Sequence, residues 1–139
     1  MYGSDIVMGF LGNQASSFAD ATLMIQTAGF LSMLMAFIYA KRKHFLKHDK
    51  TTKISVFLGA LSLIWMSYSL VSNLLSIISI TSVGLIIVLH SVIGSLAMFT
   101  GSFMIFGEIK KTKSSMIIAF FSWTAAMFLG VILYYMLLT

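Results

Sequence analysis

The sequence predicts an all-α integral membrane protein, a four-helix transmembrane bundle with its N-terminus and C-terminus outside. Hydrophobic residues make up 59% and charged residues 9% of the 139 positions, whereas soluble domains carry about 25% charge. No Lys, Arg, Asp or Glu occurs in residues 21–40, 54–107 or 114–139. Because about 20 apolar residues cross a bilayer as a helix, the middle stretch holds two crossings and a turn.

Residues 1–19 are predicted to precede the bundle as an interfacial segment. They carry no positive region of the kind that opens a signal peptide, and their apolar cluster is too short to span. A segment lying against the first helix is one interpretation, and a flexible tail is the alternative. Residues 20–139 are predicted to form a single four-helix transmembrane domain.

The four predicted spans cover about residues 20–40, 53–76, 82–107 and 115–138. Short connections make consecutive helices antiparallel neighbours. Plausible N-caps stand at each entry, because their side-chain oxygens can accept from a free N–H of the first turn. These residues are Asp20, Thr51 or Thr52, Thr81 or Ser82, and Thr112 or Ser114.

All nine Lys and Arg residues fall in two segments, 41–53 and 110–113, which are the first and third connections. Short basic loops stay cytoplasmic, so both loops are predicted on the cytoplasmic side of the plasma (cell) membrane and both termini on the outer side. The net charge of +5 therefore indicates orientation and contact with lipid rather than with nucleic acid. The predicted headgroup contacts are Lys41, Arg42, Lys43, Lys47, Lys110 and Lys111.

The first basic segment also contains His44 and His48, whose spacing suits a divalent metal on one helix face. Asp49 is the one evident third ligand. The neighbouring lysines oppose cation binding electrostatically, which favours a solvated basic loop at the membrane surface.

Small residues recur at four-residue and seven-residue spacing within the spans. They let helix backbones approach closely in lipid, so these stripes should face either the bundle or a partner subunit. The main members are Ala28, Ser32, Ala36 and Ala40, then Ser55, Gly59, Ser62, Ser69 and Ser76, then Ser91, Gly94, Ser95, Ala97 and Gly101, and finally Ser122, Ala126 and Gly130.

His90 is the sharpest candidate for a functional residue. It lies about 12 Å inside the outer end of the third span, where ionisable residues are rare. Counting inward from the outer ends brings Gln26, Tyr68 and, nearer the surface, Asn73 to similar depth, which predicts a structural polar cluster. In that interpretation His90 is a neutral, hydrogen-bonded imidazole.

The alternative is that His90 binds a cofactor, either haem or copper. One His cannot complete a closed metal site, so a metal would need Met98, a partner chain, or a single axial ligand. The chain has no Cys, and no catalytic residue or dedicated metal site is predicted.

From residue 20 onward the chain resembles the small four-helix membrane proteins of domain-of-unknown-function family 420, which includes proteins implicated in maturation of haem–copper oxidases. The resemblance rests on four segments, with His48 and His90 matching the family pattern and Asn73 and Lys113 standing where it has histidines. The segments are "KRKHFLKHDKTTK", "WMSYSLVSN", "IVLHSVIGSLAM" and "FLGVILYYMLL".

The expected function is that of a non-catalytic accessory or assembly subunit, not an enzyme, within a larger membrane oxidoreductase complex. The resemblance implies a haem–copper oxidase, and a membrane copper monooxygenase is another possible host. The alternative is a small haem-binding membrane electron carrier that uses His90. A channel or transporter is disfavoured because the spans show no charged or broken-helix pathway.

Overall fold

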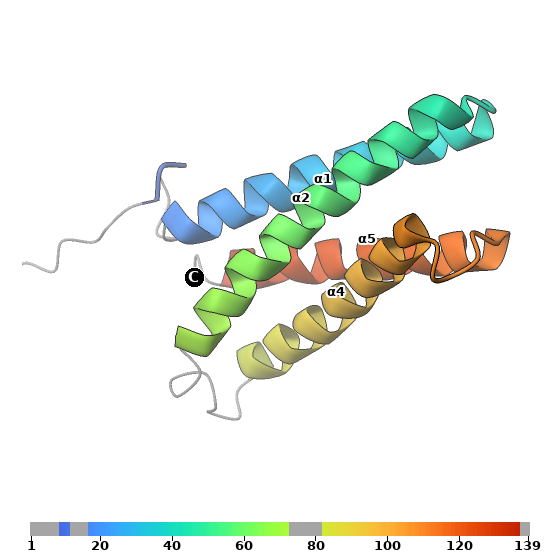
Figure 1. Ribbon diagram of the computed structural model, residues 1–139. Coiled ribbons are helices and arrows are strands. Elements are labelled where there is room, and N and C mark those ends of the chain that lie inside the picture. Colours follow the sequence, from blue (N-terminus) through green and yellow to red (C-terminus); the bar gives the residue numbers. More distant parts are fainter. Residues whose placement is uncertain (1–8, 12–16, 73–81, 137–139) are drawn as a thin grey trace, which may run out of the picture.

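The computed structural model describes residues 9–11, 17–72 and 82–136, and this part of the chain folds into four helices (Figure 1). They are α1 (Ser17–Lys41), α2 (Phe45–Ser72), α4 (Ser82–Phe106) and α5 (Lys113–Met136). Helices α1 and α5, and α4 from Gly84, are long and apolar enough to cross a membrane. The all-helical prediction is therefore confirmed, and these apolar helices are those of a membrane protein.

The predicted N-cap at Thr51 or Thr52 is wrong, because α2 already begins at Phe45, before the predicted span start near residue 53. The basic run is itself helical. Lys53 Nζ lies 2.6 Å from Asp49 Oδ2 at i, i+4 spacing, and Thr51 Oγ1 donates to the Lys47 carbonyl. Thr51 therefore lies inside the helix and does not cap it.

The N-cap of α5 agrees with one of the two predicted residues. Thr112 Oγ1 accepts from the Ser115 amide at 3.2 Å, and the Thr112 amide donates to Ser115 Oγ at 3.0 Å. This reciprocal pair is a capping box in which Ser replaces the usual Glu or Gln. It gives the Ser115 amide a partner where α5 begins, whereas the Thr112 amide also donates to the Lys110 carbonyl at 2.8 Å.

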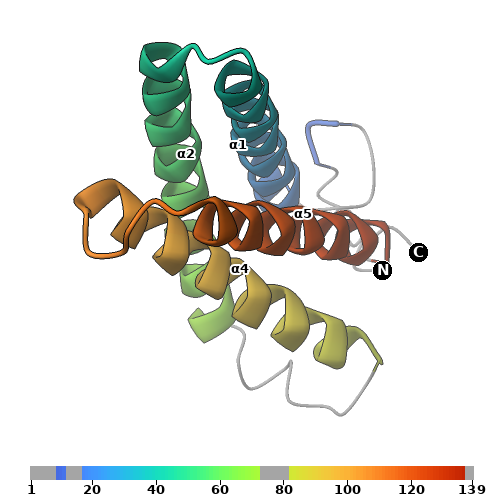
Figure 2. The same cartoon turned by 90° about the vertical axis from the view of Figure 1, so that its right-hand side faces the viewer.

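The helices are arranged as two hairpins, α1 with α2 and α4 with α5 (Figures 1 and 2). In each hairpin, the first helix ends just before a residue with a positive φ angle. Lys43 has φ 58° and Gly107 has φ 82°, and the following amides of His44 and Glu108 donate back to the carbonyls of Tyr39 and Phe103. These are Schellman-type ends, in which a left-handed residue stops the helix.

Small side chains hold the helices together. Within the first hairpin, the buried Ser55 Oγ donates to the Gly29 carbonyl at 2.9 Å. Between the hairpins, a Cβ on Gly59 would strike Met98 Sδ and lie 2.8 Å from Trp123 Cζ2. The buried apolar residues of the described chain are alanines and methionines: Ala36, Ala97, Met98, Met104, Ala119 and Ala126.

The small-residue stripes consequently face the interior of the described bundle at most of their positions. Ser55 and Ser62, seven residues apart, are both buried, as are Ala36, Ala97 and Ala126. Ala28 is an exception, since it is exposed. Ser69 and Ser76 lie outside the residues whose side chains the structure describes.

Both basic segments lie at the same end of the molecule (Figure 1). Lys111 Nζ of the α4–α5 connection is 3.9 Å from Asp49 Oδ1 of α2. The arrangement agrees with the sequence-based expectation that the two segments share one side.

The glycine contact gives a testable prediction. Gly59→Ala should lower the thermal unfolding temperature of the protein in detergent, because overpacking a tight contact costs about 1–3 kcal/mol. The rigid Trp123 ring blocks the new side chain even if Met98 moves aside. Gly94→Ala is the matched control, since its Cβ would meet Ala126 Cβ at 3.8 Å, an ordinary contact. Equal stability of the two variants would show that the hairpins separate easily at Gly59.

Candidate functional site

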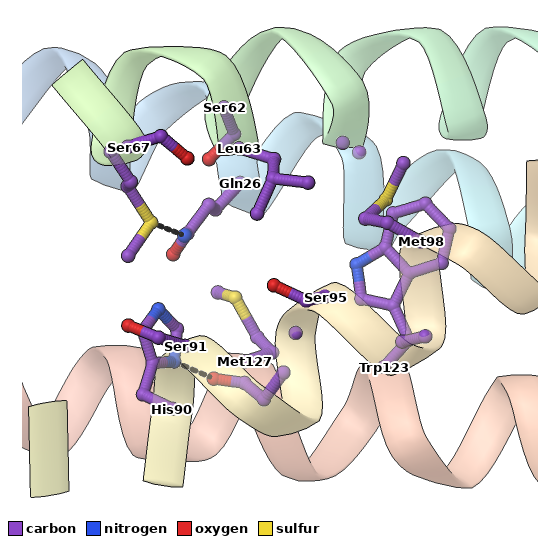
Figure 3. A pocket seen from close by; sticks show the side chains of 16 residues that line it. Gln26, Ser62, Leu63, Ser67, His90, Ser91, Ser95, Met98, Trp123 and Met127 are labelled. Carbon is purple, nitrogen blue, oxygen red and sulfur yellow. Dashed lines mark hydrogen bonds between the residues drawn. The ribbon is translucent and has the colours of Figure 1, made fainter. Parts of the chain in front are cut away.

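A cavity of about 140 Å³ lies between the two hairpins and is lined by all four helices (Figure 3). No charged side chain contributes to its described lining, which is made of hydroxyls, an amide, an imidazole, methionines, Leu63, Trp123 and small residues. The polar lining residues are Gln26, Ser62, Ser67, His90, Ser91 and Ser95.

His90 links α4 to α5 at one end of this cavity. The side chain is 5% exposed, and Nδ1 lies 2.8 Å from the Ala126 carbonyl oxygen. Because a carbonyl only accepts, Nδ1 is the donor, and in the neutral ring Nε2 keeps a lone pair. Nε2 is turned toward the cavity and has no hydrogen-bond partner in the described structure (Figure 3).

Gln26 approaches the same end of the cavity from α1. Its Nε2 donates to Met66 Sδ at 3.1 Å, and a thioether is a weak acceptor. Gln26 Oε1 and His90 Cε1 each lie 3.0 Å from where a Cβ on Gly130 would stand. The absent side chain at Gly130 therefore lets these two groups lie close together, so the structure brings Gln26 and His90 of the predicted cluster to one place.

Tyr68 does not join this cluster. It is 74% exposed, and the bond of His90 goes to the Ala126 backbone instead. The estimate rested on depth along a span, and depth does not fix the direction of a side chain. Tyr68 is two positions beyond Met66, about 200° around the helix at 3.6 residues per turn, so it points away from the cavity. Asn73, the fourth predicted member, lies outside the described residues.

Ser62 is a cavity residue that the sequence reasoning treated only as packing. It is 3% exposed, and its Oγ has no hydrogen-bond partner among the described residues. A buried hydroxyl without a protein partner requires a partner from elsewhere, such as water or a ligand. The available signal was its seven-residue spacing from Ser55, which put both hydroxyls on the inner face of α2.

A second polar contact, at the opposite end from the basic loops, joins the first and last helices. Asp20 has no exposed surface. Tyr134 Oη donates to its Oδ1 at 2.6 Å, and the Leu11 amide donates to Oδ2 at 3.0 Å. The predicted capping role of Asp20 is wrong, because α1 already begins at Ser17. The bond from Leu11 ties part of the N-terminal segment to α1.

The predicted histidine pair of the basic loop is divided between two roles. His48 Nδ1 bonds the Ala36 carbonyl at 2.9 Å and so fastens α2 to α1, whereas His44 is exposed and directly precedes α2. The Lys53 ammonium beside Asp49 lowers the pKa of that carboxyl by hydrogen bonding. No group of three His, Cys, Asp or Glu residues that could hold a metal occurs within the described part of the chain.

The six residues predicted to meet lipid headgroups are all exposed: Lys41, Arg42, Lys43, Lys47, Lys110 and Lys111. Lys41 Nζ lies 4.8 Å from the centroid of the Phe37 ring, and Lys47 Nζ lies 5.8 Å from that of Tyr39. Cations over aromatic faces are attracted by the ring quadrupole.

The cavity as it stands is too small for haem, and it does not bring His90 and Met98 together (Figure 3). A cavity of about 150 Å³ accommodates benzene, so the cavity volume here of about 140 Å³ cannot enclose a porphyrin. Met98 and Trp123 lie at the end of the cavity away from His90 (Figure 3). Met98, the sulfur ligand considered for a metal, is therefore not brought to His90.

No family model, curated protein or solved structure was found to match the chain.

Substitutions of His90 test its helix-linking role. His90→Ala should lower the unfolding temperature, since it leaves the buried Ala126 carbonyl without its side-chain donor, a loss of about 1–3 kcal/mol. His90→Gln should recover part of this loss, because an amide N–H can still donate to the carbonyl. His44→Ala is the control at an exposed position. If Gln is as unfavourable as Ala, the Ala126 bond is not what stabilises this contact.

The contact between Asp20 and Tyr134 can be tested by comparing substitutions of two adjacent tyrosines, Tyr134 and Tyr135. Tyr134→Phe should destabilise the protein by about 1–3 kcal/mol, because it removes a donor from a buried carboxylate. Tyr135→Phe should have little effect, since Tyr135 is 69% exposed. Unfolding of both variants can be followed by circular dichroism in detergent. Similar midpoints for the two variants would contradict a stabilising role of the Asp20 contact.

Proposed function

We propose that all four helices cross the membrane, with α2 as the additional span. Its 28 residues extend roughly 42 Å at 1.5 Å per residue, longer than the hydrocarbon core of about 30 Å. The helix is uncharged from Ile54 onward, and its basic first turns stand beside the end of α1. An α2 antiparallel to a spanning α1 returns across the same bilayer.

The orientation follows from the shared end of the two basic loops. Short loops rich in Lys and Arg remain on the cytoplasmic side, which places both termini outside a plasma membrane. The ammonium groups of Lys41 and Lys47 lie over the rings of Phe37 and Tyr39, on exposed side chains that can also attract lipid phosphates. These groups are the basis for proposing membrane lipids as one set of partners.

Within this topology we propose that the protein is a non-catalytic accessory or assembly subunit of a larger membrane oxidoreductase complex. The observation that carries the proposal is a row of large side chains on the outer face of α5. Phe121, Phe128 and Tyr135 recur every seven residues and are 64–69% exposed. Ala125 and Ile132 lie between them and Ile118 lies one turn before Phe121, all three exposed on the same face.

This α5 row has the period of a helix–helix seam. Alternating steps of three and four residues keep side chains on one face for packing against a second helix. Ala125 gives a small side chain near the middle of the row, where a partner helix could approach closely. The proposed host, a haem–copper oxidase or a membrane copper monooxygenase, has other membrane subunits able to supply that helix, and the sequence resemblance supports the first of these.

Photo-cross-linking tests the subunit proposal directly. A benzophenone amino acid at position 121 or 128 should form adducts with one large membrane subunit, which mass spectrometry identifies in native membranes. Positions 57 and 64 on α2 are matched controls, because Phe57 and Ile64 are also seven residues apart and 69–70% exposed, but their row has Leu61 where the α5 row has the small Ala125. Adducts to lipid alone at 121 and 128, or a partner that belongs to no oxidoreductase, would overturn the proposal.

The topology has its own test, because the chain contains no Cys. Single substitutions Lys47→Cys and Lys111→Cys should resist an impermeant maleimide added to intact cells and react after lysis. Gly3→Cys and Thr139→Cys should react in intact cells. Labelling of Lys47→Cys from outside would contradict the proposed orientation.

A further inference from the structure

We propose that the cavity between the hairpins binds the uncharged, ring-sized head of a membrane-soluble amphiphile, a head that carries a hydroxyl group on an aromatic ring. The apolar tail of that molecule would lie in a groove on the outside of α4. This inference does not depend on the α5 partner surface, because it concerns other helix faces.

The size of the cavity sets the size of the head. Its volume of about 140 Å³ is close to that of the engineered cavity of about 150 Å³ that binds benzene. One six-membered ring therefore fits, whereas a porphyrin or a nucleotide does not. Trp123, Met98 and Met127 supply apolar and polarizable contacts for a ring (Figure 3).

The cavity lining has both hydrogen-bond acceptors and donors without strong partners, and a hydroxyl group can bond to both. His90 Nε2 offers a lone pair because Nδ1 is committed to Ala126. The Oγ of Ser62 is buried without a partner among described residues, and the Gln26 amide donates only to a thioether. A phenolic hydroxyl can donate to Nε2 and accept from Ser62 or Gln26, so both halves of the group are used.

The charge of the lining excludes an ionic head. The described lining holds no Lys, Arg, Asp or Glu, and burying an unpaired charge is far more costly than burying a hydrogen-bonded hydroxyl. Phosphate-bearing lipid heads are therefore expected at the basic end of the bundle and not in this cavity. The head in the cavity is neutral.

The path into the cavity runs past two serines. Ser91 and Ser95 line the cavity and also line a shallow groove on α4, together with Val92, Leu96 and Phe99. Val92, Leu96 and Phe99 are 52–59% exposed, so the groove opens on the outer surface. A hydrocarbon tail in this groove would replace bilayer contacts with similar apolar contacts while the head occupies the cavity.

Fluorescence of Trp123 tests the proposal on the full chain in lipid nanodiscs. Trp65→Phe leaves Trp123 as the only Trp, since the sequence has two. The probe is 2-bromo-4-hexylphenol, whose bromine quenches nearby indole, and the control compound is 1-bromo-4-hexylbenzene, which lacks the hydroxyl. We expect saturable quenching by the phenol, with an apparent Kd about tenfold lower than that of the control compound.

Two variants connect that difference to the cavity. Ser62→Ala should weaken phenol binding several-fold without unfolding the protein, because Ser62 makes no bond to the described chain. His90→Phe should remove most of the hydroxyl advantage. Ser102→Ala on α4, at a half-buried position away from the cavity lining, should bind as the parent does.

Three results would overturn the inference. Equal quenching by both compounds would indicate simple partitioning into lipid. Non-saturable quenching by the phenol would show that the cavity holds only water. A hydroxyl advantage that persists in both Ser62→Ala and His90→Phe would place the phenol elsewhere on the protein.

Discussion

The close approach of the two hairpins at Gly59 is the constraint on which the rest of the bundle depends. A side chain at this position would overlap Met98 and the Trp123 ring, so the separation of α2 from α4 and α5 is set by the lack of one. In lipid there is no hydrophobic force between apolar helices, and dispersion between closely packed surfaces must hold them together. The buried alanines extend the same type of contact along the helices.

This style of packing also explains where the polar side chains lie. Small contacts leave room between the hairpins, and polar groups that cannot face hydrocarbon occupy that room. Some of them bond backbone carbonyls of a neighbouring helix, as His90 does with Ala126 and Ser55 does with Gly29. Each such bond fixes both the rotation and the axial position of a helix, because a carbonyl oxygen has one place and one direction. Dispersion sets the distance between the helices, and these bonds set their register.

Much of the fold could be predicted from the sequence, because helix formation and the position of the basic loops depend on hydropathy and charge along the chain. The uncharged stretches indicated the helices, and the clustering of Lys and Arg indicated which connections share an end. The basic run of α2 was misjudged because an i, i+4 ion pair and helical hydrogen bonds allow charged residues to continue a helix beyond its apolar part.

The site was predictable only in part. His90 and Gln26 were identified from their estimated depth along the predicted spans. Tyr68 was misplaced, because depth does not determine in which direction around the helix axis a side chain points. The hydrogen bond between Asp20 and Tyr134, and the burial of the Ser62 hydroxyl in the cavity, became visible only when residues distant in the sequence were brought together.

The bond between Tyr134 and Asp20 has a consequence for biosynthesis. The two residues are 114 positions apart, and ribosomes add about 5–20 residues per second, so roughly 6–23 s separate their synthesis. Throughout that interval the first helix carries a carboxylate without this partner, near the end of a segment that must reside in the membrane. A chain that stalls before its last helix leaves that carboxylate without the Tyr134 hydroxyl, whereas its other donor, the Leu11 amide, has already been synthesised. An unfinished chain therefore differs from a finished one in the hydrogen bonding of the Asp20 carboxylate, because the donor from the last helix arrives only at the end of synthesis.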